Sequence, residues 1–325
     1  RAVGVLSGLT NPKTRDRVGT ELLALQESQR VKRAMKRTPR VAIQAAHDNA
    51  FEIDFIGSPT PKPKLLGQVF KRDHELASLI PYIDWSPLFS AFDMAGQYPA
   101  IFDHPKKGAA AKSLFADVQA ELTSMLADPR CGGRSWHGVF TARSTVSKIE
   151  LFKDETCRAP LADFHTLRQQ MPKTVGANMS VADFVAPKTA DVSDYVGAFV
   201  VTAGLGVAER VHAYEADGDD YTAILVKAIA DRFAEALAEY LHEHVRRETW
   251  GYEQGPPATP EERIAAKYVG IRPAPGYAAV PDHVMKREIF SVLGLRDNPD
   301  VTLTSSFAIN PPASVSGLYF ARPEA

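Results

Sequence analysis

The residues with the clearest capacity for ligand chemistry lie in one short stretch, IRPAPGY, at residues 271–277. Its two prolines carry no amide donor and fix φ, so the backbone there is expected to hold free carbonyl oxygens in fixed positions. Gly276 lets a ligand approach the main chain closely, and Tyr277 adds a flat aromatic face. Arg272 carries a planar guanidinium that suits a carboxylate or a phosphate. These residues predict either a ligand-binding loop or a rigid surface turn with a structural arginine.

Two other patterns resemble functional motifs but are incomplete. The glycines of TAGLG at 202–206 lack the third glycine and the later acidic residue of a dinucleotide fingerprint, so they predict a strand-ending turn. DFHTLR at 163–168 has Arg168 where the D-x-H-x-x-G signature of cobalamin-binding domains has glycine. We therefore expect no cobalt ligand there.

Possible metal ligands are too few at any one place. Cys131 with His137, and Cys157 with His165, could each supply two ligands, and neither pair completes a zinc set. The sequence predicts no metal site in this chain.

Composition narrows the class of protein. The chain has 325 residues and a formal net charge of −1 at pH 7, which gives no general attraction to nucleic acid or to an anionic membrane. No apolar run approaches the roughly 20 residues that span a bilayer. Only two cysteines are present, which argues against a disulfide framework and predicts a reducing, cytoplasmic location. Because the first residue is Arg1, we expect a piece of a longer protein.

One long helix is the clearest element that could position a site. Residues 219–247 place apolar side chains three or four positions apart on one stripe, which is typical of an amphipathic helix packed on a core. Asp231, Glu235 and His242 form a separate polar row on this helix. A shorter helix is expected from Asp282, as N-cap, to Gly294.

The remaining elements are predicted mainly as strands. Alternating patterns predict strands at 132–144 and 148–155, and a closing antiparallel pair formed by 301–309 and 313–322. Residues 194–206 are a further strand candidate, which ends in glycines. Strands and helices follow one another without a regular βαβ rhythm. The predicted fold class is therefore α+β, with mixed helices around a twisted antiparallel sheet.

The first 37 residues differ from the rest of the chain. AVGVLSGL at 2–9 predicts a strand, 10–30 predicts a helix, and 31–40 is a basic segment closed by Pro39. Without aromatic residues among the charges, the basic segment indicates a solvated linker rather than a nucleic-acid arm.

Several long motifs together resemble one known family. RPAPGYAAVPDH, YIDWSPLF, ADFVAPK, DYVGAFVVTAGLG, DDYTAILVKAIADRFAEALAEYLHEHVR and ASVSGLYF are similar, in order, to the C-terminal activation domain of cobalamin-dependent methionine synthase. The resemblance covers most of residues 38–325. It implies that 1–37 is the tail of the cobalamin-binding domain plus a linker. Family chains continue past Ala325 with a tyrosine-bearing segment that touches the ligand, so the C-terminus of the domain is expected to be truncated.

The resemblance implies a site for S-adenosylmethionine. Asp84 matches the acid that holds the ammonium of the methionyl end, Arg272 matches the arginine that pairs with its carboxylate, and Glu235 matches a further acid of the site. Ala274, Gly276 and Tyr277 match positions that line the ligand, and His283 would lie near the surface that faces the corrin. The guanidinium of Arg272 is expected to serve the ligand rather than the fold.

The implied function is reactivation of the enzyme. S-adenosylmethionine would supply a methyl group, and flavodoxin or an equivalent reductase an electron, to return cob(II)alamin to methylcobalamin and so sustain methionine synthesis. Cobalamin would be held by the neighbouring domain of the same chain, and no zinc thiolates, folate barrel or catalytic residue are expected here. The alternatives are a non-catalytic S-adenosylmethionine-binding or docking module and a free-standing methyltransferase with another acceptor. No nucleic-acid or membrane partner is expected.

Overall fold

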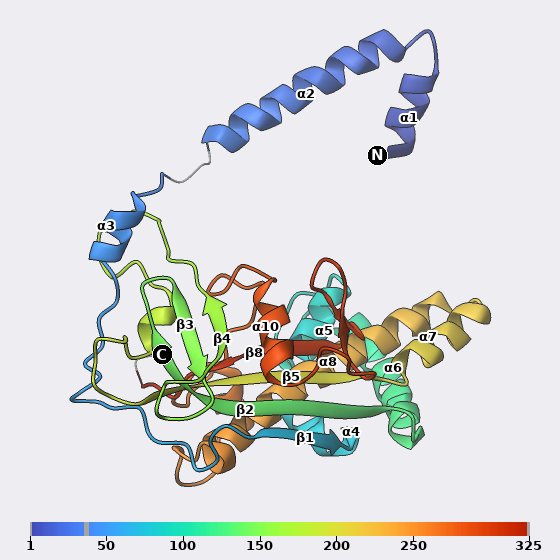
Figure 1. Cartoon of the computed structure of the whole chain (residues 1–325). Helices are drawn as coiled ribbons and strands as arrows, with labels where there is room; N and C mark the ends of the chain where they lie inside the picture. Colours follow the sequence, from blue (N-terminus) through green and yellow to red (C-terminus); the bar gives the residue numbers. More distant parts are fainter. Residues whose placement is uncertain (1, 36–38, 324–325) are drawn as a thin grey trace. The chain divides into compact units, whose positions relative to one another are not determined.

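A computed structural model of the chain describes residues 2–35 and 39–323. It divides into two compact units, one of Arg1–Asn49 with Gln169–Asn178 and one of Ala50–Arg168 with Met179–Ala325 (Figure 1). The predicted boundary between residues 37 and 38, and the chain end at Ala325, lie outside the described residues. The larger unit contains every residue predicted to bind a ligand.

The smaller unit is helical. It consists of α1 (Ala2–Thr10), α2 (Arg15–Met35) and α3 (Ile43–Asp48), with the segment 169–178 beside α3 in the same unit. The predicted strand at 2–9 is wrong, because this stretch forms α1. Gly8 allows α1 to pack closely on Val18 of α2, since a Cβ at Gly8 would lie 2.9 Å from a Val18 methyl. A short apolar run does not by itself distinguish a strand from a packed helix.

A six-stranded antiparallel sheet forms the centre of the larger unit. The order is β4-β3-β2-β5-β8, and β1 pairs with the first half of β2. Its strands are β1 (Val69–His74), β2 (Gly132–Ser144), β3 (Lys148–Phe152), β4 (Pro160–His165), β5 (Asp194–Leu205) and β8 (Ser314–Tyr319). This sheet and its flanking helices confirm the predicted α+β class.

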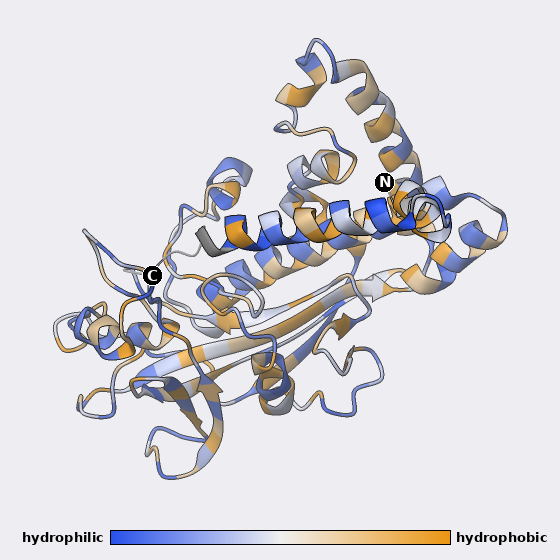
Figure 2. Ribbon diagram, turned by 90° about the horizontal axis from the view of Figure 1, so that it is seen from above, coloured by the Kyte–Doolittle hydropathy of each residue, from blue (hydrophilic) through white to orange (hydrophobic). Residues whose placement is uncertain are grey.

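Both faces of the sheet are covered. Successive residues of β5 point to opposite sides, so Phe199 and Val201 belong to one apolar cluster and Val200 to the other. This explains why β5 is buried along nearly its whole length. Figure 2 shows much apolar colour along the long strands, whereas the helices alternate between polar and apolar bands.

The helices of the larger unit pack on these two faces (Figure 1). Residues of α4 to α8 join the first cluster, and residues of η3 and α10 join the second. The helical elements are α4 (Leu76–Leu79), η1 (Ile80–Tyr82), α5 (Ser86–Ala91), η2 (Ala100–Asp103), α6 (Gly108–Ala127), η3 (Val181–Phe184), α7 (Val207–Ala216), α8 (Asp220–His244), the π-helical turn η4 (Val245–Thr249), α9 (Pro260–Ile264) and α10 (Met285–Val292).

The C-terminal strands pair differently from the prediction. Residues 301–310 form their own small hairpin of β6 (Thr302–Leu303) and β7 (Ile309–Asn310), while β8 pairs with β5. Pro311 and Pro312 lack amide donors and separate the two ladders. The predicted pairing of 301–309 with 313–322 is therefore wrong. The short helix is confirmed, although it begins at Met285 rather than directly after Asp282.

Candidate functional site

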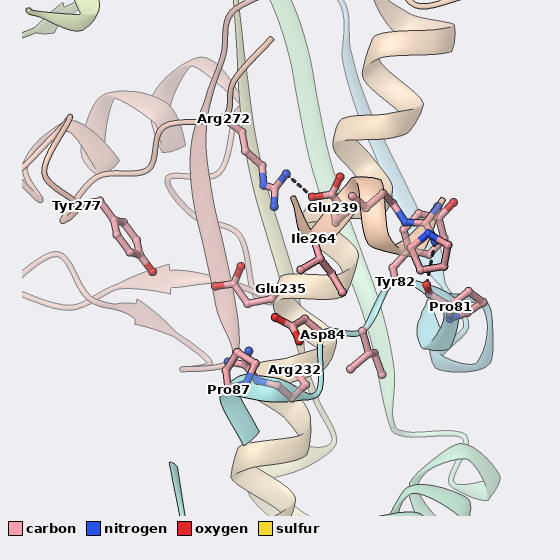
Figure 3. Close-up of a pocket in the computed structure, with 13 residues that line it drawn as sticks. Pro81, Tyr82, Asp84, Pro87, Arg232, Glu235, Glu239, Ile264, Arg272 and Tyr277 are labelled. Atoms are coloured by element: carbon pink, nitrogen blue, oxygen red, sulfur yellow. Dashed lines mark hydrogen bonds and ion pairs between the residues drawn. The ribbon is translucent and has the colours of Figure 1, made fainter. Parts of the chain in front are cut away.

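A cavity of about 400 Å³ lies beside α8 in the larger unit (Figure 3). Three segments far apart in the sequence line it together with α8. The lining residues are Pro81, Tyr82, Ile83, Asp84, Pro87, Arg232, Glu235, Glu239, Pro260, Arg263, Ile264, Arg272 and Tyr277. Four of the six predicted site residues are among them, namely Asp84, Glu235, Arg272 and Tyr277.

Helix α8 supplies one wall. The side chain of Asp219 caps its start by accepting a hydrogen bond of 2.9 Å from the amide of Thr222. Apolar residues on the stripe predicted from the sequence, such as Phe233 and Leu237, are fully buried in the core. Arg232, Glu235 and Glu239 recur at intervals of three and four, so they lie on one helix face and point to the cavity together.

Asp84 enters from a short connection between η1 and α5. One of its carboxylate oxygens accepts a hydrogen bond of 2.9 Å from the amide of Ser86, which fixes the side chain at the start of α5. Its other oxygen has no partner in the described part of the chain. Asp84 and Glu235 both line the cavity (Figure 3).

The loop at 271–277 is joined to the end of the central sheet. Ile271 and Phe320 exchange two backbone hydrogen bonds of 3.1 Å, and the amide of Leu318 donates to the carbonyl of Pro273 at 3.0 Å. The carbonyl of Ala274 accepts from the amide of Tyr277 at 3.3 Å. The expectation of free carbonyls is therefore wrong at residues 271, 273 and 274. The prolines stiffen a loop whose backbone extends the sheet.

Gly276 and Ala274 belong to this loop but do not line the cavity. Gly276 has φ of +104°, and a Cβ there would lie 2.4 Å from the imidazole of His283. The backbone conformation therefore favours glycine, and any side chain there would displace the imidazole of His283. Tyr277 follows with 66% of its surface exposed, and its ring lies across the cavity from α8 in Figure 3.

Arg272 has a partner that the sequence did not reveal. Its Nη1 lies 2.5 Å from Oε2 of Glu239 and donates a hydrogen bond of 2.8 Å to the hydroxyl of Tyr268. Burial opposes the charge of Arg272, but the carboxylate of Glu239 and the hydroxyl of Tyr268 raise its pKa above the usual value. The guanidinium is therefore held by the fold as well as facing the cavity, which corrects the expectation that it serves only a ligand.

A buried polar cluster supports this pair from behind. Arg246 is fully buried, donates through Nε to Glu253 at 2.7 Å, and lies 3.8 Å from the ring centroid of Tyr268. His242 is also fully buried and stacks on Tyr319 with ring centroids 5.0 Å apart. Burial lowers the pKa of His242 well below its usual value, and the neighbouring arginines act in the same direction, so the ring is neutral.

The charges around the cavity divide into paired and unpaired groups. Glu239 neutralises Arg272, and Arg263 lies 3.6 Å from Glu243 and over the ring of Tyr82. Asp84, Glu235 and Arg232 have no ion-pair partner among the residues that the structure describes. Two carboxylates and one guanidinium thus remain available in the cavity, a combination that suits a ligand with more positive than negative charge.

The sequence predicts no metal site and contains no apolar run long enough to span a membrane. Within residues 2–35 and 39–323, no group of three or more histidine, cysteine or acidic side chains could hold a metal ion. Cys131 and Cys157 are free thiols. None of the described helices is long and apolar enough to cross a membrane.

The spacing of acidic residues on the long helix indicates that Glu239 belongs to the site. It lies four positions after Glu235 and so shares the face that the polar row defines. The polar row as predicted was Asp231, Glu235 and His242, and it omitted Glu239. The pairing of Glu239 with a residue 33 positions later is a tertiary contact that spacing does not reveal.

Two comparisons with known proteins identify relatives of this chain. Residues 75–325 match the family described as vitamin B12 dependent methionine synthase, activation domain. A solved structure described as the MetH reactivation domain bound to AdoHcy is 43% identical, covers 89% of this chain and 88% of its own, and superposes with a TM-score of 0.85. The chain therefore belongs to the family of vitamin B12-dependent methionine synthase activation domains.

Proposed function

We propose that the cavity binds S-adenosylmethionine and presents its methyl group for reactivation of the methionine synthase of which this domain is part. The observation that carries the proposal is the pair of carboxylates without an ionic partner, Asp84 and Glu235, in the same cavity as the guanidinium of Arg272. The 43% identical structure is described as bound to AdoHcy, the product of the same ligand after methyl transfer.

The ligand's chemistry fits these groups. S-adenosylmethionine carries an ammonium, a sulfonium, a carboxylate and a purine. Asp84 would hold the ammonium, Arg272 the carboxylate, and Glu235 would add a second negative charge on the cationic side. Tyr277 would lie against the purine, while Ala274 and Gly276 would shape the loop that carries it.

The chain's own part in the reaction is binding and orientation. Transfer breaks the bond between the methyl carbon and the sulfonium sulfur, and the electron pair stays on sulfur as the neutral thioether S-adenosylhomocysteine. Because the leaving group is neutral, no general acid or base is needed, and we assign no catalytic residue. Cobalamin, held by the neighbouring domain of the full chain, would accept the methyl group together with an electron from flavodoxin or an equivalent reductase.

The whole enzyme's activity depends on more than this domain. We infer that the full chain is a methyltransferase, that this domain alone does not complete methionine synthesis, and that its immediate partners are the cobalamin-binding domain and the reductase. We also place it in the cytoplasm, since both thiols are free.

Calorimetric titration with S-adenosylmethionine tests the proposal. One site per chain, with competition by S-adenosylhomocysteine, is expected. Absence of binding by a folded protein would refute it. Methyl transfer to a corrinoid supplied in trans with a reductant would separate a reactivation domain from a non-catalytic binding or docking module. Methylation of a small acceptor without a corrinoid would favour a free-standing methyltransferase.

A further inference from the structure

The guanidinium of Arg272 makes all its protein contacts through one corner. Nη1 lies 2.5 Å from Oε2 of Glu239, 2.8 Å from the hydroxyl of Tyr268 and 3.4 Å from Nδ1 of His242. Nε and Nη2 have no partner in the part of the chain that the structure describes, and neither is a buried atom lacking a hydrogen bond. One edge of the planar group is therefore left for the cavity, as Figure 3 shows.

Glu239 is itself held in place. Its side chain is only 8% exposed, and besides the ion pair with Arg272 its Oε2 accepts a hydrogen bond of 3.1 Å from the hydroxyl of Tyr268. Its Oε1 lies 3.8 Å from Nη1 of the fully buried Arg246. Arg272 and Tyr268 thus hold Oε2, Arg246 lies on the side of Oε1, and α8 fixes the backbone of Glu239.

We infer that Glu239 is a positioning residue for ligand binding, which aims the free edge of Arg272 at the carboxylate of the ligand. This inference rests on the proposed function and extends it to a residue that is not expected to touch the ligand. Tyr268 assists by accepting from Arg272 and donating to Glu239, so two hydrogen bonds and one ion pair join the three side chains in a closed ring.

The physical basis is preorganisation. An arginine side chain has many rotamers, and ordering it only when a ligand arrives would cost binding free energy. A guanidinium fixed at one corner still offers two parallel donors at its remaining edge, which is the geometry that a carboxylate prefers. Glu239 also keeps Arg272 neutralised in the absence of ligand, so that the cavity does not contain an uncompensated buried charge.

The test measures how strongly the protein recognises the carboxylate of the ligand. The affinity of the protein is measured for S-adenosylmethionine and for its decarboxylated form, which keeps the purine, sulfonium and ammonium but lacks the carboxylate. The wild-type protein is expected to prefer S-adenosylmethionine. Glu239→Gln should lower this preference about tenfold, the typical effect of losing one charge-assisted hydrogen bond. Arg272→Ala should abolish the preference.

A matched control exists elsewhere in the same unit. Glu121 is a buried acid that lies 2.5 Å from Nε of Arg210 and accepts 2.9 Å from the hydroxyl of Tyr214, and neither it nor its partners line the cavity. Glu121→Gln should lower the melting temperature as Glu239→Gln does but leave the ratio of the two affinities unchanged.

The outcomes separate this inference from the proposed function. If the wild-type protein binds neither ligand, both fail. If Arg272→Ala removes the preference but Glu239→Gln leaves it unchanged, or lowers both affinities equally, only the role of Glu239 is refuted. Should Glu239→Gln not fold, Tyr268→Phe opens the same closed ring while keeping the aromatic ring under Arg246. The inference then stands only if Tyr268→Phe lowers the preference for S-adenosylmethionine over its decarboxylated form.

Discussion

Nη1 of Arg272 lies 2.5 Å from Oε2 of Glu239, a residue one helical turn beyond Glu235 on the same face of α8. Arg272 therefore has two functions: it binds Glu239 within the fold, and it lines the cavity. It also links the loop at 271–277 to the longest helix of the larger unit.

Replacing Arg272 should therefore affect both stability and binding. Arg272→Ala leaves the buried carboxylate of Glu239 without its nearest partner, so the free energy of unfolding should fall by about 2 kcal/mol, and S-adenosylmethionine binding should be lost. Thermal unfolding and calorimetric titration measure the two effects. An unchanged melting temperature with lost binding would show that the pair with Glu239 contributes nothing to the fold.

Replacing Asp84 should change the affinity for the ligand without changing the stability of the protein. Asp84→Asn keeps an oxygen that can accept the hydrogen bond from Ser86 but removes the negative charge. Affinity for S-adenosylmethionine should fall at least about tenfold, with little change in melting temperature. Asp54 is a suitable control, because its carboxylate accepts from the amides of Ile56 and Gly57 in a similar turn and does not line the cavity. Equal affinities of the Asp84 variant and wild type would contradict the assignment of the ammonium to Asp84.

Gly276 should tolerate no side chain. Alanine there would adopt φ of +104° and contact His283, so Gly276→Ala should lower both stability and ligand affinity. Gly218→Ala controls for backbone strain alone, because φ is +76° at Gly218 and open space surrounds it. Adding His283→Ala should restore part of the loss at Gly276 but none at Gly218. No restoration would show that contact with His283 is not the cause.

Stability should decrease as the pH falls from 7 to 5. Burial lowers the pKa of His74 to about 4 and that of His137 to about 3, and nearby positive charge such as Arg72 acts in the same direction. In the unfolded chain both rings titrate near their ordinary value of about 6.5. Over this range the unfolded state binds protons that the folded state does not, so the stability that is fully present above pH 6.5 is progressively lost.

His137→Gln tests this origin of the pH dependence. The amide can still reach the hydroxyl of Thr249, which lies 3.0 Å from Nε2 of His137, but it does not titrate. Melting temperatures measured between pH 7 and pH 5 should therefore fall less steeply in the variant. A slope equal to that of wild type would mean that other groups cause the decrease.

Much of the fold was predictable because it depends on local periodicity. The stripe of α8 predicts a buried face, and Phe233 and Leu237 are indeed in the core. The strand predicted at 194–206 is confirmed as β5. The strand predicted at 2–9 is wrong because a short apolar run is compatible with either structure, and here it forms a helix that packs through Gly8 on Val18. Strand β8 likewise pairs with β5, which is distant in the sequence, and not with the segment 301–309 that precedes it.

The candidate site was predictable in its residue types but not in its internal pairing. Arg272 and Tyr277 are predicted from the chemistry of their loop, Asp84 and Glu235 are implied by the family resemblance, and the fold brings all four to one cavity. Their contacts with a ligand remain proposals. Glu239, Tyr268 and Arg246 carry no motif of their own, and only the folded chain shows that they surround Arg272. The proline loop also differs from expectation, since several of its carbonyls bind the sheet.

The hydrogen bonds between residues 271–273 and the end of β8 have a consequence for how this domain can vary. Two of the segments that line the cavity are a helix packed on the sheet and a loop bonded to the same sheet, so the spacing between Arg272 and the acids of α8 is fixed by the interior of the domain. The exposed residues 254–257 can therefore vary in composition among relatives without altering that spacing, whereas Glu253, which binds Arg246, cannot.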